Sequence, residues 1–90
     1  MKYSVNITRN AEKELKSLDP KIADRIGSRL LILKDNPKSP KSKHLKGTTF
    51  YRLRIGDYRV IYNIDHEIKI IDILSIGHRK EIYRQLRRLS

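Results

Sequence analysis

Apolar and polar residues alternate on both sides of a Gly-Asp pair in the middle of the chain, over residues 50–64. Alternation with a period of two is typical of a β-strand that buries one face. A two-residue connection that opens with glycine suits a type II′ hairpin turn. With Gly56 and Asp57 as the turn, the pairing of the two strands is fixed from Ile55 opposite Tyr58 outward. The face predicted to point toward the core carries Tyr51, Leu53, Ile55, Tyr58, Val60 and Tyr62.

The other face of this hairpin carries three arginines, Arg52, Arg54 and Arg59. The predicted register places Arg54 directly across from Arg59, and like charges in that position destabilise an antiparallel pair. A fold with no use for these charges would more often hold a neutral or mixed pair there. Since the guanidinium fork matches the geometry of phosphate, we interpret this face as an anion site.

The first third of the chain predicts one strand and two helices. Residues 2–7 alternate as a short strand, and Thr8 is a suitable N-cap for the helix that follows. A second helix begins at Asp19-Pro20, because aspartate caps well and proline fits the first helical position. It should end near Asn36-Pro37, since the residue before a proline is disfavoured in the α conformation. The stripes predicted to be buried are Ala11, Leu15 and Leu18 on the first helix and Ile22, Ile26, Leu30 and Leu33 on the second, widened by Leu31 and Ile32.

Residues 37–49 are predicted to be a basic loop, and residues 65–67 a second turn. Residues 68–76 form an almost continuous apolar run, typical of a strand inside a sheet, which Gly77 is expected to end. Residues 79–89 predict a closing helix with Ile82, Leu86 and Leu89 on one stripe.

The order of elements is therefore β-α-α-β-β-β-α, which predicts a single α+β domain over residues 1–90. We expect one four-stranded, mostly antiparallel sheet, with the amino-terminal helical hairpin on one face and a short closing helix. The first strand is expected to rejoin the sheet beside the last one.

The net charge of +11 arises from 21 Lys and Arg against 10 Asp and Glu. Seven basic residues and one acidic residue lie between Lys38 and Arg59, and five and one lie between Gly77 and Ser90. Charge concentrated in this way favours a nucleic-acid partner, although an acidic protein or simple solubility are alternatives. The chain contains no cysteine, no membrane-length apolar run and no recognisable signal peptide, so we expect a cytoplasmic protein. No spacing of residues indicates a metal site or a small-molecule cofactor.

The closing helix adds two candidates for chemistry, Arg79 and Tyr83, which are four residues apart and share a face. Placed over the arginine face, they would suit RNA, because cations bind phosphates and an aromatic ring stacks on an unpaired base. The alternative is that Tyr83 packs on the edge of the sheet while Arg79 makes a local cap. His78 and Glu81 are further candidates, for proton transfer. His44 and His66 lie in predicted loops and are expected to be solvated.

Residues 51–62, Tyr-Arg-Leu-Arg-Ile-Gly-Asp-Tyr-Arg-Val-Ile-Tyr, and residues 73–83, Ile-Leu-Ser-Ile-Gly-His-Arg-Lys-Glu-Ile-Tyr, resemble the RelE/ParE toxin superfamily of toxin–antitoxin modules. The resemblance covers essentially the whole chain and is to the RelE-like branch. It implies the RelE-like microbial RNase fold and a ribosome-dependent, metal-independent endoribonuclease that cleaves messenger RNA in the A site. It also implies inhibition of translation, and neutralisation by an acidic RelB-like antitoxin.

The resemblance implies roles for particular residues. The family's two basic sheet residues fall on Arg52 and Arg54, its hairpin arginine on Arg59, its arginine after the last strand on Arg79 and its carboxy-terminal tyrosine on Tyr83. These five would be catalytic as the 2′-hydroxyl of the messenger attacks the adjacent phosphate, while Lys41, Lys43 and Lys46 would contact ribosomal RNA.

The chain departs from the family where a lysine able to act as a base is common and arginine stands here. Arginine, with a pKa above about 12, is a poor proton acceptor. Tyr83, His78 and Glu81 are the candidates that remain for this role. Two other readings stay open: a ParE-like inhibitor of a DNA topoisomerase without chemistry of its own, and a basic RNA-binding module without toxicity.

Overall fold

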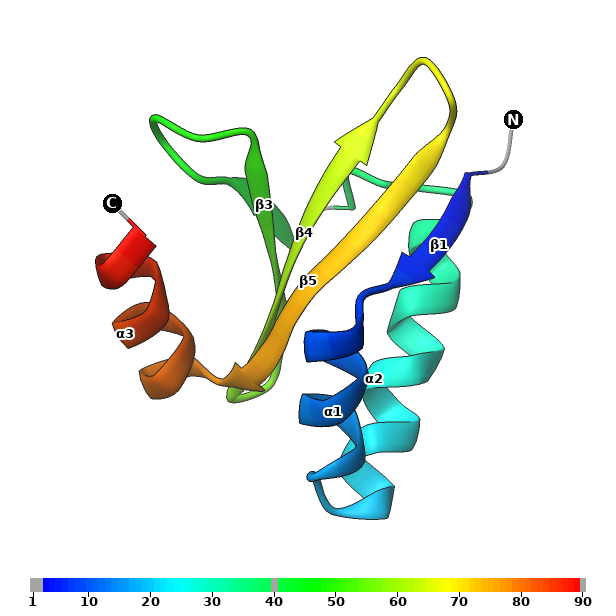
Figure 1. The fold of residues 1–90 in the computed structure, drawn as a ribbon. Helices are drawn as coiled ribbons and strands as arrows, with labels where there is room; N and C mark the ends of the chain where they lie inside the picture. Colours follow the sequence, from blue (N-terminus) through cyan, green and yellow to red (C-terminus); the bar gives the residue numbers. More distant parts are fainter. Residues whose placement is uncertain (1–2, 40, 90) are drawn as a thin grey trace.

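The computed structural model describes residues 3–39 and 41–89, with side chains described as far as residue 85. Five strands form one sheet in the order β1-β5-β4-β3-β2 (Figure 1). The elements are β1 (Ser4–Ile7), α1 (Arg9–Lys16), α2 (Pro20–Leu33), β2 (Ser42–His44), β3 (Phe50–Ile55), β4 (Tyr58–Asp65), β5 (Ile70–His78) and α3 (Arg79–Leu89). Part of the first predicted strand, at residue 2, lies outside the described residues.

The sheet is mixed, because β1 runs parallel to β5 while the other neighbouring strands are antiparallel. The position of β1 beside the last strand confirms the prediction. The prediction of four strands was wrong, since β2 lies inside the segment expected to be a loop. Its sequence, Ser-Lys-His, has no apolar alternation, and it is a strand because it pairs with the edge of β3. This pairing places Lys43 opposite Arg52.

The central hairpin has the predicted register from Ile55 opposite Tyr58 to Tyr51 opposite Tyr62. Gly56 has a φ of 57°, as the first residue of a type II′ turn requires, and a side chain would be strained there. The next ladder contains an irregularity, because Ile61 pairs with Ser75 while Tyr62 pairs with Ile73, which leaves Leu74 as an extra residue on β5.

Helices α1 and α2 cover one face of the sheet (Figure 1) and bury Ala11, Ile26, Leu30 and Leu33 against the apolar face of the hairpin. The predicted caps are confirmed, with Thr8 accepting from the amide of Ala11 and Asp19 from that of Lys21. Leu18 lies beyond the end of α1 but still packs on the core. No helix in residues 3–39 and 41–89 is long and apolar enough to cross a bilayer.

The prediction that Leu31 and Ile32 widen the buried stripe of α2 was wrong, since they are 60% and 51% exposed. Leu30 and Leu33 are three residues apart and point to the same side of the helix, whereas the two residues between them turn away from the sheet. The hydrophobic pattern alone could not show this, because all four residues are apolar.

Helix α3 lies on the opposite face of the sheet from α1 and α2 (Figure 1). Its Ile82 is fully buried, and Ile61 of β4 is buried on the same face. The prediction that Gly77 ends the last strand was wrong, because β5 continues to His78. A Cβ on Gly77 would lie 3.5 Å from Cδ1 of Ile82, an ordinary contact distance, so α3 packs directly over this part of β5. The predicted positions of Leu86 and Leu89 on the apolar stripe lie outside the described side chains.

Candidate active site

Arg52 and Tyr83 meet on the face of the sheet that α3 only partly covers. Nη1 of Arg52 donates a hydrogen bond to the Tyr83 hydroxyl at 2.9 Å, and the guanidinium carbon lies 5.7 Å from the centre of the tyrosine ring. The side chain of Tyr83 is exposed on this face. The tyrosine therefore stands beside the arginine face and presents its ring to solvent, as binding of an unpaired base requires.

Arg59 lies beneath this pair and is only 6% exposed. Its Nη1 donates to the carbonyl oxygens of Gly56 at 2.7 Å and Tyr58 at 2.9 Å, so the guanidinium is held by the hairpin turn. Among the described residues, the Nε–H groups of Arg59 and Arg52 are buried and have no acceptor. Buried donors are normally paired, so each of these two arginines keeps one donor that the described residues leave unsatisfied.

The pKa of Tyr83 is lowered by its cationic surroundings. The interaction of its hydroxyl with the Arg59 guanidinium is the largest cause. Burial opposes it, and the charges of Arg52, Arg59 and Arg79 lower the pKa further. Arg79 begins α3, where its backbone amide donates to the carbonyl of Asp57 at 2.8 Å and so joins the helix to the hairpin turn. Three guanidiniums thus act on one phenol and make it more acidic than an ordinary tyrosine.

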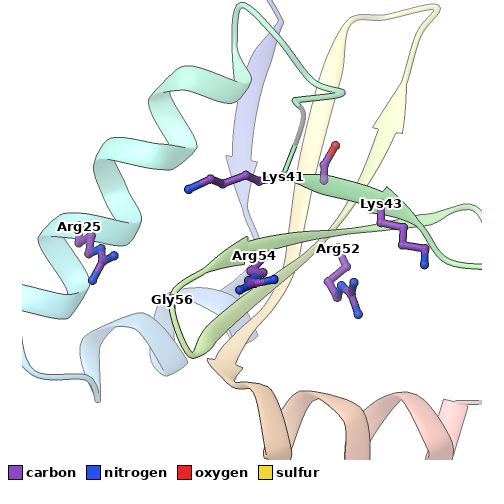
Figure 2. Close-up of a pocket in the computed structure, with 7 residues that line it drawn as sticks. Arg25, Lys41, Lys43, Arg52, Arg54 and Gly56 are labelled. Atoms are coloured by element: carbon purple, nitrogen blue, oxygen red, sulfur yellow. The ribbon is translucent and has the colours of Figure 1, made fainter.

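Arg54 projects from the same face of the hairpin, opposite Arg59, but is exposed. It lines a groove of about 640 Å³ at the edge of the sheet, together with Arg52. Figure 2 shows the side chains around this groove, which come from α2, β2, β3 and the segment before β2. The lining residues are Arg25, Lys41, Ser42, Lys43, Arg52, Arg54 and Gly56.

The two candidates for proton transfer lie in different places. His78 pairs with Tyr58, a residue of the core face, and its ring packs edge-on against the Tyr58 ring at 5.7 Å. It therefore points to the opposite side of the sheet from the arginines. Glu81 lies nearer the site, because its Oε2 is 3.8 Å from the point that a Cβ on Gly77 would occupy, and Gly77 pairs with Arg59.

The predicted lysines are all exposed, but only two of them border the groove. Lys41 and Lys43 line it, whereas Lys46 lies in the turn before β3 and does not. His44 and His66 are exposed as predicted; the first packs against Tyr51 and the second shares a hydrogen bond with the Tyr3 hydroxyl. Sequence reasoning missed Arg25, which α2 brings to the tip of the hairpin.

A network of hydrogen bonds fixes α3 to the rest of the fold through Glu14 of α1. The carboxylate of Glu14 accepts from the amide of Ile76 at 3.1 Å, from the Ser75 hydroxyl at 3.0 Å and from Asn10 at 3.0 Å. Gln85 of α3 contacts both Ser75 and Glu14, at 2.8 and 3.4 Å. Glu14 therefore replaces a neighbouring strand at the part of β5 that β1 does not reach, and it joins the helix that carries Tyr83 to α1.

Replacing Glu14 with alanine is expected to loosen α3 on the sheet. The buried amide of Ile76 would lose its acceptor, which costs about 1–3 kcal/mol of the free energy of unfolding. Hydrogen exchange of the α3 amides should accelerate more than that of β3 and β4. Glu14→Gln retains an oxygen acceptor, so the hydrogen exchange of its α3 amides should be close to that of the unmodified protein. Equal protection of α3 in the alanine variant would show that the network does not hold the helix.

Comparisons with known proteins identify the class to which this fold and site belong. The family model described as the ParE toxin of the type II toxin–antitoxin system, parDE, matches residues 5–83. Toxin RelG of Mycobacterium tuberculosis is 35% identical over 89 residues, which is 94% of this chain and 100% of RelG. The chain therefore belongs to the RelE/ParE superfamily of type II toxins.

Solved structures agree with this class and place the chain in its RelE-like branch. The archaeal RelE–RelB complex from Pyrococcus horikoshii OT3 contains a chain that is 36% identical, with a TM-score of 0.77, over 88% of this chain and 97% of that one. The RelBE2 toxin–antitoxin complex from Mycobacterium tuberculosis gives 29% identity and a TM-score of 0.81, over 88% of this chain and 100% of that one. The α+β fold with a five-stranded mixed sheet is thus shared with RelE toxins.

Proposed function

We propose that this toxin is a ribosome-dependent endoribonuclease that cleaves messenger RNA in the A site and so stops translation. The observation that carries the proposal is the contact of Arg52 with the hydroxyl of Tyr83 on the sheet face that also carries Arg54 and Arg59. Guanidiniums gathered on one face suit a phosphate, and a base next to that phosphate would reach the exposed ring of Tyr83.

In the proposed reaction the 2′-oxygen of a ribose attacks the adjacent phosphorus while the bond from phosphorus to the 5′-oxygen breaks. The products are a 2′,3′-cyclic phosphate and a free 5′-hydroxyl. Negative charge builds up on the phosphate oxygens, and the guanidiniums of Arg52, Arg59 and Arg79 stabilise it. The 2′-hydroxyl gives up its proton and the 5′-oxygen gains one. Tyr83, as phenolate, is the candidate acceptor, with Glu81 as the alternative.

The proposal extends to the partners of the toxin. The two solved relatives described above are toxin–antitoxin complexes, and a surface of net charge +11 suits an acidic antitoxin that neutralises this chain. Lys41, Lys43 and Lys46 are exposed and are proposed to contact RNA backbone without base specificity. Lys43 and Lys46 would contact ribosomal RNA, whereas Lys41 lines the groove beside Arg54.

Cleavage is tested directly in a reconstituted translation reaction with a defined messenger. We expect primer extension to map new 5′ ends in the codon that occupies the A site, with a cyclic phosphate on the upstream fragment. The same messenger without ribosomes should remain largely intact.

The family model that matches this chain is described as a ParE toxin, which keeps inhibition of a DNA topoisomerase as the second candidate. If the purified toxin left the messenger intact but blocked DNA supercoiling by gyrase, that candidate would replace the first. In cells, the order in which protein synthesis and chromosome replication stop after induction separates the two in the same way.

A further inference from the structure

The groove at the sheet edge extends the arginine site toward α2. Arg25 projects from α2 to the tip of the hairpin, where its Nη2 lies 3.7 Å from the point that a Cβ on Gly56 would occupy. On the other side, Lys41 precedes β2 and its backbone oxygen accepts from the amide of Arg54 at 3.2 Å. Figure 2 shows Arg25 and Lys41 at the end of the groove nearest α2, with Arg52 and Arg54 on β3.

The charges in this groove are unpaired. Five of its seven lining residues are cationic, and none is acidic. In the described part of the chain the one ion pair joins Lys16 and Glu12 of α1, so no carboxylate lies within 4 Å of the groove cations. Cations held close together without counter-ions raise each other's energy, and a bound polyanion removes that repulsion.

The lining also limits what kind of polyanion fits. The groove contains no aliphatic or aromatic residue, only the cations with Ser42 and Gly56. An acidic protein segment that folds on binding needs apolar anchors to offset the entropy lost on ordering. A ribose-phosphate backbone has no such requirement, because cations that neutralise phosphates gain free energy from the release of counterions. Arg52 belongs both to this groove and to the Tyr83 site, so one strand can occupy the two at once.

We propose that this groove is a second phosphate subsite, where Arg25 and Lys41 hold the RNA strand beyond the nucleotide bound at Tyr83. The proposal rests on the proposed function, since it supplies the remainder of the same strand. Arg25 is then a binding residue and not a catalytic residue. In a cleavage assay its replacement by alanine raises KM while kcat changes little.

The direct test is the salt dependence of RNA binding. The probe is a fluorescein-labelled single-stranded RNA with 2′-O-methyl riboses, which cannot be cleaved, and Kd is measured by anisotropy from about 50 to about 200 mM KCl. Removing one phosphate contact from a single strand lowers the slope of log Kd against log salt by about 0.7. We expect this change for Arg25→Ala and about twice it for Arg25→Ala with Lys41→Ala. The matched control is Arg9→Ala, since Arg9 is exposed on α1, which packs on β5 away from the groove.

The outcomes separate this inference from the proposed function. If the slope of log Kd against log salt is the same for Arg25→Ala and Arg9→Ala, the groove is not a phosphate subsite, even if the toxin cleaves messenger RNA normally. If Arg25→Ala reduces the slope but the unmodified toxin cleaves no RNA, the phosphate subsite is supported and the proposed endoribonuclease function is wrong. Poly-L-glutamate is the competitor for the acidic-protein alternative. If it displaces the RNA from the unmodified toxin at equal charge concentration, and Arg25→Ala weakens its binding equally, the groove is a site for acidic chains and the inference is wrong.

Discussion

Arg59→Ala and Arg79→Ala are each expected to relieve the growth arrest caused by this toxin when it is expressed without its partner. Removing one donor that stabilises charge in a transition state costs about 10²–10³ in kcat. Arg59 should show the larger loss, because its guanidinium is buried beneath the phenol and keeps an unpartnered N–H, whereas Arg79 is exposed. Growth curves and the cleavage assay measure both effects.

The two variants differ in what else they disturb. Arg59 also donates to the carbonyl oxygens of Gly56 and Tyr58, so its loss should lower the free energy of unfolding by about 1–3 kcal/mol. Arg79→Ala keeps the backbone bond to Asp57 and should remain as stable as the unmodified protein. Arg84→Ala is the matched control, since Arg84 is exposed on the same helix and does not contribute to the pKa of Tyr83. If both variants stayed fully toxic while folded, the assignment of these arginines would be wrong.

The part of the site built on the hairpin could be predicted because a two-residue turn fixes its register. Once Gly56 and Asp57 form the turn, alternation determines which side chains share a face, and the observed pairs of Arg54 with Arg59 and Leu53 with Val60 follow. Arg79 and Tyr83 joined that face because a helix brings residues four apart to one side, and the apolar stripe fixed which side faces the sheet.

The part of the site that depends on contacts between distant elements could not be predicted in this way. Arg25 reaches the hairpin tip only through the packing of α2 on the sheet, which no local pattern specifies. The sequence pattern also gave no sign of Glu14, which binds the amide of Ile76 at the edge of β5 and contacts Gln85 of α3. His78 shows a different failure. The prediction ended the strand at Gly77, so the direction of the His78 side chain was not fixed. The observed strand includes His78 and places its side chain on the core face beside Tyr58.

In the proposed cleavage Tyr83 would carry a step that the arginines cannot, because no arginine can accept the proton of the 2′-hydroxyl at physiological pH. Two roles remain for the tyrosine, and each predicts a different effect of Tyr83→Phe. A ring that only stacks on a base would work almost as well in phenylalanine. A hydroxyl that accepts the proton would be lost, and with it about 10²–10⁴-fold of the rate. Tyr83→Ala removes both functions and gives the lower limit.

We expect Tyr83→Phe to lose the rate contribution of about 10²–10⁴-fold that comes from proton acceptance. The decisive measurement is the pH dependence of the cleavage rate. In the proposed mechanism the active form is the phenolate, so single-turnover cleavage should rise with pH and level off above the pKa of Tyr83. Since Arg59, Arg52 and Arg79 lower that pKa, the plateau should begin below the pH at which an ordinary tyrosine, with a pKa of 10.0, ionises. Tyr83→Phe should lose this rise, and Arg79→Ala should move it to higher pH because one stabilising charge is gone. A profile that Tyr83→Phe leaves unchanged in shape would transfer the role of base to Glu81, whose carboxylate lies near Gly77, the partner of Arg59 in the sheet.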